Sequence, residues 1–352
     1  MSVALKIDSA AAAAAPGAEE AWALPLEKLN PGHAERFQND TIWPVFERLR
    51  REDPIHFTPE SEFGPYWSIT RWEDILAVDT NHEAFSSAQG IGLANLANRA
   101  ASEEAMRAMG REPDRRGGAG FITMDEPEHS VQRKAVSPTL APANIAVMSP
   151  VVRERAGAIL DSLPIGQSFD WVDLVSKELT AMTLATLFDF PFEQRRKLTY
   201  WSDMVTNQPG HGPVESFEQK ATELFNCFGA FEELWNQKVN APPGADLISM
   251  LINNPHTKEM SRRTYHGNVI LLIVGGNDTT RNTISGSVYN LNKFPAEYDK
   301  LRANPALIPS MVSETIRYQT PLAHMARVAT RDVELGGKTI KAGDQVVMWY
   351  IS

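Results

Sequence analysis

The chain has 352 residues, of which 43% are hydrophobic and 22% are charged, as in an ordinary globular protein. It carries 34 Lys and Arg against 44 Asp and Glu, and the resulting net charge of −10 argues against a nucleic-acid-binding protein. Its single cysteine, Cys227, excludes an intramolecular disulfide bond and a four-cysteine zinc or iron–sulfur site, and favours the cytoplasm. The longest aliphatic run, Val269–Val274, has six residues. A membrane span needs about 20, so we expect no membrane anchor.

Residues 1–40 are predicted to form a flexible N-terminal leader. They contain an alanine tract, Ala10–Ala15, but no leucine-rich segment of the kind found in export signals. The ordered part is expected to begin with a helix over Ile42–Asp53, because apolar residues recur there on one helical face and a proline follows. Two short apolar runs, Ile55–Phe57 and Tyr66–Ile69, predict strands of a small sheet.

The rest of the chain is predicted to be mainly helical. Residues 90–120 are rich in Gly, Ala and Arg without periodicity, which is typical of a lid over a binding site. From Glu126 to Gln319 the apolar spacing is helical, and Val333–Ile351 alternates as strands do. Because the strands cluster near the two ends of the chain, we predict a mostly α fold of the α+β class. No glycine-rich phosphate-binding motif is present, so a nucleotide-binding protein is not indicated.

The most informative segment is Val269–Arg281, where an apolar run meets two glycines and then Asp278 and Thr279. In a continuous helix, Gly275 would let a flat ligand or cofactor lie against the backbone. The threonine hydroxyl could bond the carbonyl one turn back, and the acid and alcohol could relay protons. The alternative is that the glycines end one helix and Asp278 caps the next.

Two further pairs have helical spacing. Glu314 and Arg317 are three residues apart, and His129 and Arg133 are four apart, so each pair shares a helical face. An imidazole and a guanidinium on one face can hold a carboxylate together. Taken alone, each pair is more typical of an ordinary surface pair.

The order of these motifs along the chain resembles the cytochrome P450 family of haem-thiolate monooxygenases. The resemblance runs from about Trp43 to the end of the chain. Four phrases carry it, and they are most similar to the bacterial branch that hydroxylates alkane ends: MDEPEH at Met124–His129, QRKAVSP at Gln132–Pro138, LLIVGGNDTTRN at Leu271–Asn282 and ETIRYQTPLAHM at Glu314–Met325.

This resemblance implies the cytochrome P450 fold and a haem b cofactor. It implies hydroxylation of the terminal methyl group of medium-chain n-alkanes or fatty acids to a primary alcohol. The reaction would use dioxygen and two electrons, supplied by a ferredoxin and its NAD(P)H-dependent reductase.

The same resemblance assigns roles to individual residues. It places His129 and Arg133 on a haem propionate, Arg327 on a propionate as well, and Gly275 against the haem. The Glu314 and Arg317 pair matches the structural ExxR pair of the family. Asp278 and Thr279 match the acid and alcohol that deliver protons to bound dioxygen. Val274, Leu322 and Met325 are candidates for the substrate pocket, although each could equally be an ordinary core residue.

The resemblance also exposes a departure from the family pattern. The axial cysteine of the family lies in a loop well downstream of the ExxR helix, and this sequence stops at Ser352 before such a loop. Cys227 lies in an apolar helical pattern upstream and is not a substitute. We therefore expect residues 41–352 to be a single cytochrome P450 domain that lacks its axial cysteine, with that cysteine beyond Ser352. Such a fragment would be inactive alone.

Two alternatives remain open on sequence grounds. One keeps the monooxygenase and replaces the alkane with a terpene or another compact apolar substrate. The other, from a different class, is a haem-free binding protein for hydrophobic ligands. The second gains nothing from a carboxylate buried beside its ligand, which argues against it.

Overall fold

The computed structural model describes residues 16–112 and 120–352, and these form two compact units. The first unit combines the described residues up to Ala100 with Leu322–Ser352, and the second is Ala101–Pro321. Each unit is considered by itself below. The predicted helix over Ile42–Asp53 and the two strands that follow it are present. The mostly helical fold with small sheets near both ends of the chain is confirmed.

The first unit is built on a five-stranded sheet with the strand order β1-β2-β7-β4-β3. Its neighbouring strands are antiparallel, apart from the parallel pair β2 and β7. A separate hairpin, β5–β6, turns through Gly336 and Gly337, whose positive φ angles suit a two-residue loop. The strands are β1 (Ile55–Thr58), β2 (Tyr66–Ile69), β3 (Phe85–Ser86), β4 (His324–Ala329), β5 (Val333–Leu335), β6 (Lys338–Ile340) and β7 (Gln345–Trp349).

Helices pack against this sheet around a core that contains Phe46, Leu49 and Trp349. Phe46 and Leu49 lie on the predicted apolar face of α4, and the Phe46 ring centroid is 5.5 Å from that of Trp349. The helices of this unit are α2 (Ala18–Ala23), η1 (Leu26–Lys28), α3 (Ala34–Gln38), α4 (Trp43–Glu52) and α5 (Trp72–Asp79), and α6 (Leu96–Ala108) runs across the boundary between the units.

The flexible leader predicted for residues 1–40 is wrong from Gly17 onward. Residues 1–15 lie outside the described residues, but Ala21 and Leu29 are fully buried in the core of the first unit. The Arg48 guanidinium also donates hydrogen bonds to the Ala21 and Leu24 carbonyl oxygens, at 2.7 and 2.5 Å. These contacts hold the segment against α4, and the alanine-rich composition did not reveal them.

The lid predicted for residues 90–120 is only partly irregular. It contains α6, whose thirteen residues include the buried Ala105. Residues 113–119 lie outside the described residues.

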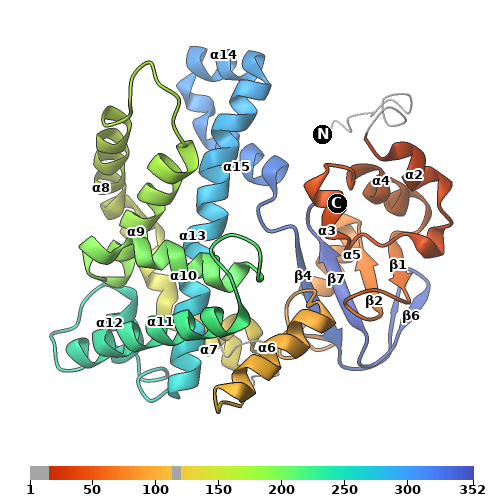
Figure 1. The fold of residues 1–352 in the computed structure, drawn as a ribbon, viewed down its shortest axis with the longest axis horizontal. Coiled ribbons are helices and arrows are strands. Elements are labelled where there is room, and N and C mark those ends of the chain that lie inside the picture. The colour runs from red at the N-terminus through yellow and green to blue at the C-terminus, as the bar shows by residue number, and fades with distance from the viewer. Residues whose placement is uncertain (1–15, 113–119) are drawn as a thin grey trace. The chain divides into compact units, whose positions relative to one another are not determined.

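The second unit is helical, and α13 runs through it (Figure 1). Its core joins aromatic and aliphatic side chains of several helices, among them Phe188, Phe231 and Ile273. Its helices are η2 (Phe121–Thr123), α7 (Glu128–Val136), η3 (Ser137–Leu140), α8 (Pro142–Asp161), the π-helical η4 (Val172–Lys177), α9 (Glu178–Phe188), η5 (Phe192–Gln194), α10 (Arg196–Thr206), α11 (Phe217–Lys238), α12 (Leu247–Asn253), α13 (Arg262–Lys293), α14 (Pro295–Ala303), η6 (Pro305–Leu307) and α15 (Ile308–Gln319).

Among the described residues, no single helix is long and apolar enough to cross a membrane. One pair of helical segments, Glu128–Leu140 and Pro142–Asp161, bent by 45°, meets the length and composition requirements together.

We predict that Gly120→Ala lowers the free energy of unfolding by about 1–3 kcal/mol. A Cβ atom at Gly120 would lie 2.5 Å from the Gly267 carbonyl oxygen, so η2 and α13 would have to separate. The matched control is Gly157→Ala in α8, where an added Cβ meets nothing within 4 Å. The control should raise stability by about 0.5–1 kcal/mol. Urea denaturation measures both, and equal values for the two variants would contradict the prediction.

Candidate functional site in the helical unit

The central feature is α13, which continues without interruption through its two glycines. It contains 32 residues and begins at the Ser261 cap, whose hydroxyl accepts a hydrogen bond from the Thr264 amide. The alternative in which Gly275 and Gly276 end a helix is therefore wrong. Good caps and tertiary packing outweigh the low helix propensity of two glycines, which costs about 1 kcal/mol each.

The two glycines have different neighbours. A Cβ atom at Gly276 would lie 2.6 Å from Leu184 Cδ2, so this glycine lets α9 approach α13 closely. A Cβ atom at Gly275 would meet nothing within 4 Å, and this residue is exposed. Gly275 therefore leaves bare backbone beside open space, which would allow a flat group to lie against it.

Thr279 lies one turn beyond this open position. Its hydroxyl donates a hydrogen bond of 3.0 Å to the Gly275 carbonyl oxygen, as predicted. The bond fixes the hydroxyl oxygen close to Gly275 and leaves its lone pairs able to accept a further hydrogen bond. Thr283 repeats the arrangement one turn later, donating to the Thr279 carbonyl oxygen at 2.8 Å.

Asp278 is neither fully buried nor unpaired. Its side chain is 25% exposed and forms an ion pair with Arg281, at 2.5 Å between Oδ1 and Nη2. The fully buried polar residue of this segment is Asn277, whose Oδ1 accepts a hydrogen bond from Thr180 at 3.2 Å. The only sequence signal for Asn277 is its position four residues before Arg281, which places both residues on one helical face.

His129 and Arg133 lie on α7, one turn apart, as predicted. The His129 Nδ1 atom is 3.1 Å from Glu126 Oε1, and hydrogen bonds from Ser130 and His129 lower the pKa of the Glu126 carboxyl. Arg133 is exposed, and no side chain in the described parts of the chain pairs with it. Its guanidinium is therefore free to bind a carboxylate.

Glu314 and Arg317 form a bidentate pair on α15. Arg317 donates from Nε and Nη2 to the two carboxylate oxygens at 2.8 and 2.6 Å. The pair lowers the pKa of the Glu314 carboxyl and raises the pKa of Arg317. Both side chains are exposed, at 60% and 68%.

The face of α15 that contacts α13 is not the face that carries the large apolar residues of this helix. Thr315 is buried, and the Gln319 side chain packs where Gly286 of α13 lacks a Cβ atom. Val312 and Ile316 are exposed, at 42% and 49%. An apolar strip therefore lies open on α15 in this structure.

The remaining predicted site residues divide between the units. Val274 is half-buried on α13 of the helical unit. In the first unit, Leu322 is exposed and Met325 is buried in β4. Arg327, also in β4, pairs with Asp79 at 2.8 Å. A propionate would therefore have to compete with, or join, an existing partner of Arg327.

Cys227 lies at the core of the helical unit and is fully buried. Burial raises the pKa of its thiol, which disfavours the thiolate that binds iron. No group of three or more His, Cys, Asp and Glu side chains in the described ranges could hold a metal ion. The axial ligand of a haem is therefore not supplied by this cysteine.

The residues described above could hold some parts of a haem but not others. A haem needs a bare face for its flat ring, donors for its carboxylates and an axial ligand for its iron. The open backbone at Gly275 suits the ring, and the unpaired Arg133 with the nearby His129 suits a propionate. The residues fit the ring and the propionate, while the iron ligand is missing from this set.

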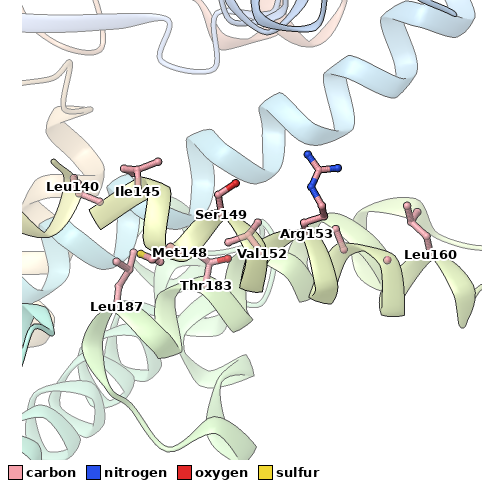
Figure 2. Close-up of a pocket in the computed structure, with 11 residues that line it drawn as sticks. Leu140, Ile145, Met148, Ser149, Val152, Arg153, Leu160, Thr183 and Leu187 are labelled. Carbon is pink, nitrogen blue, oxygen red and sulfur yellow. The ribbon is translucent and has the colours of Figure 1, made fainter. Parts of the chain in front are cut away.

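A separate cavity of about 680 Å³ lies between α8 and α9 (Figure 2). None of the predicted site residues lines it. It is mostly apolar, and its walls include Ile145, Met148, Val152, Leu160, Thr183 and Leu187.

Comparison with known proteins identifies the class. Residues 216–352 match the family model described as Cytochrome P450. The chain is 34% identical over 309 residues to linalool 8-monooxygenase of Pseudomonas putida, covering 88% of this chain and 75% of that protein. The chain therefore belongs to the cytochrome P450 family, whose members are monooxygenases with a haem iron cofactor.

Two solved structures agree with this assignment. Cytochrome P450-153 from Novosphingobium aromaticivorans is 38% identical with a TM-score of 0.78, covering 92% of this chain and 78% of that one. CYP153D17 from Sphingomonas sp. PAMC 26605 is 44% identical with a TM-score of 0.80, covering 90% and 76%. The predicted family and fold are confirmed.

We predict that Cys227 of the native protein does not react with a maleimide at pH 8. The thiol is buried and its pKa is raised, so neither access nor thiolate is available. Full labelling is expected after unfolding in urea. Mass spectrometry measures both, and rapid labelling of the native protein would contradict the assignment of Cys227 to the core.

Proposed function

We propose that this protein is a haem b monooxygenase that hydroxylates the terminal methyl group of medium-chain n-alkanes or fatty acids. The observation that carries the proposal is the unbroken helix α13, with open backbone at Gly275 and the Thr279 hydroxyl held beside it. A helix that exposes backbone next to a fixed alcohol would suit a flat cofactor that needs a proton donor close by. When bound, the haem supplies dioxygen activation.

Residues of this chain would bind the haem propionates and transfer protons. His129 and Arg133 would bind one propionate, and Arg327, which already pairs with Asp79, would bind a propionate through its remaining N–H groups. Thr279 and Asp278 hold and pass protons. The Glu314 and Arg317 pair would hold the end of α15. Dioxygen is the oxidant, and a ferredoxin with its NAD(P)H-dependent reductase supplies the two electrons.

The substrate class rests on the resemblance of the sequence motifs to alkane-hydroxylating members of the family. Val274, Leu322 and Met325, the candidate pocket residues, are all apolar. An n-alkane has no polar group, so selectivity depends on pocket shape, where one methylene contributes about 1–3 kcal/mol. A terpene is the second candidate, because linalool 8-monooxygenase is 34% identical to this chain.

A carbon monoxide difference spectrum of the dithionite-reduced protein tests the proposal. The 352-residue chain is compared with the protein expressed from its whole reading frame. A thiolate-type Soret band in the latter supports the monooxygenase, and its absence from both favours the haem-free binding protein. Product analysis with a medium-chain n-alkane and with linalool then separates the two substrate classes.

Arg133→Leu should weaken haem retention. Loss of a guanidinium bond to a carboxylate costs about 1.5–3 kcal/mol, or roughly 10–100-fold in affinity. Lys134→Leu removes a neighbouring exposed charge from the same helix and is the matched control. Haem content after gel filtration is the measurement, and equal retention in the two variants would rule out Arg133 as a propionate ligand.

Thr279→Ala should uncouple electron use from product formation. Without the hydroxyl, proton delivery should slow, and the ratio of product to NAD(P)H consumed should fall roughly tenfold or more. Thr283→Ala removes an equivalent hydroxyl bond one turn along α13 and should leave the ratio unchanged. Hydrogen peroxide and product are measured together. Unchanged coupling in Thr279→Ala would remove the proton-delivery role.

A further inference from the structure

Arg281 contacts two carboxylates from different helices. Its Nη2 atom lies 2.5 Å from Asp278 Oδ1 on α13, and its Nη1 atom lies 2.7 Å from Asp203 Oδ1 on α10. The Arg281 and Asp203 side chains are each only 12% exposed. A single guanidinium thus joins the proposed relay acid to a second acid on a neighbouring helix.

A further cation completes the cluster. Lys177, in the π-helical η4, has its Nζ atom 3.7 Å from Asp203 Oδ2. Two carboxylates and two cations make the group neutral overall, which a site of low exposure favours because an unbalanced charge there is costly. The four side chains come from three segments, η4, α10 and α13.

We propose that Arg281 and Asp203 are positioning residues for Asp278. Arg281 holds the Asp278 carboxylate in place, and Asp203 retains Arg281 when Asp278 takes up a proton and releases it. This inference rests on the proposed function, because it gives Asp278 the role of relay acid.

The physical argument concerns the guanidinium that Asp278 leaves behind. A carboxylate paired with Arg281 accepts a proton only by giving up that pair. If Arg281 had no second partner, it would then be a nearly buried and unpaired charge. Because Asp203 already contacts the other nitrogen of the same guanidinium, the release of Asp278 leaves Arg281 paired. Asp203 therefore removes the cost of an unpaired guanidinium at the step in which the Asp278 carboxylate leaves Arg281.

Opposite substitutions test this arrangement. In Asp203→Asn, Arg281 keeps Asp278 as its only anionic partner, so proton delivery should slow. We expect turnover to fall about tenfold with a larger solvent deuterium isotope effect, while the substrate dissociation constant, measured by the Soret shift, stays unchanged. A purely structural role would not separate turnover from binding in this way. Arg281→Gln should lower the ratio of product formed to NAD(P)H consumed. Arg281→Lys, which keeps the positive charge, should retain most of that ratio.

Amide hydrogen exchange provides a readout that does not depend on activity. Arg281→Gln breaks the tie to α10, so exchange in the 196–206 segment should rise about tenfold. Arg262→Gln is the matched control on the same helix, since it breaks an exposed ion pair between Arg262 and Glu232 of α11. The control should change neither the amide hydrogen exchange of α10 nor the ratio of product formed to NAD(P)H consumed.

The outcomes distinguish this inference from the proposed function. If the carbon monoxide band is absent, the monooxygenase itself fails and the role of Asp278 fails with it. If the band is present but Asp203→Asn shows the turnover and isotope effect of the unsubstituted protein, the positioning role is overturned. The near-isosteric Asp203→Asn variant keeps this test available should Arg281→Gln fail to fold.

Discussion

The close approach of α9 to α13 at Gly276 is the contact on which the site depends. Leu184 occupies the space that a side chain at Gly276 would need, and Ile273, one turn earlier, is buried in the same core. This packing holds α13 as one helix through a pair of residues with poor helix propensity. Gly275 can then remain bare on another face without breaking the helix. Gly276 allows close helix packing, and Gly275 leaves the backbone open to a ligand.

The acid and the alcohol beside this open position are held in different ways. The Thr279 hydroxyl is tied to the backbone of its own helix, so its place depends only on α13 remaining helical. Asp278 is tied to a side chain that α10 also binds, so its place depends on how two helices pack. The position of the Thr279 hydroxyl is therefore determined locally, whereas the position of the Asp278 carboxylate also depends on tertiary packing.

This difference explains what could be predicted from the sequence. The Thr279 bond follows from helical spacing alone, and so do the shared faces of His129 with Arg133 and of Glu314 with Arg317. The pair of Asp278 with Arg281, three residues on, is also local, whereas the second contact of Arg281 required knowing that Asp203, 78 residues before Arg281, lies against α13. Periodicity carries no information about such long-range contacts. The same limitation applies to α15, where the large apolar residues Val312 and Ile316 are exposed and the smaller Thr315 is buried.

Composition led to a wrong prediction for the N-terminal segment, which is held by tertiary contacts and has no strong apolar periodicity of its own. The N-terminal segment has little apolar periodicity, yet Ala21 and Leu29 are buried in the core of the first unit, and Arg48 binds the Ala21 and Leu24 carbonyl oxygens. Arg48 is itself nearly buried, and its charge is compensated by Glu52, at 3.1 Å, together with those carbonyl oxygens. A buried cation and a segment without a strong pattern thus stabilise each other. Arg281 and its two acids follow the same rule in the helical unit, where a nearly buried cation is placed by the oxygens around it.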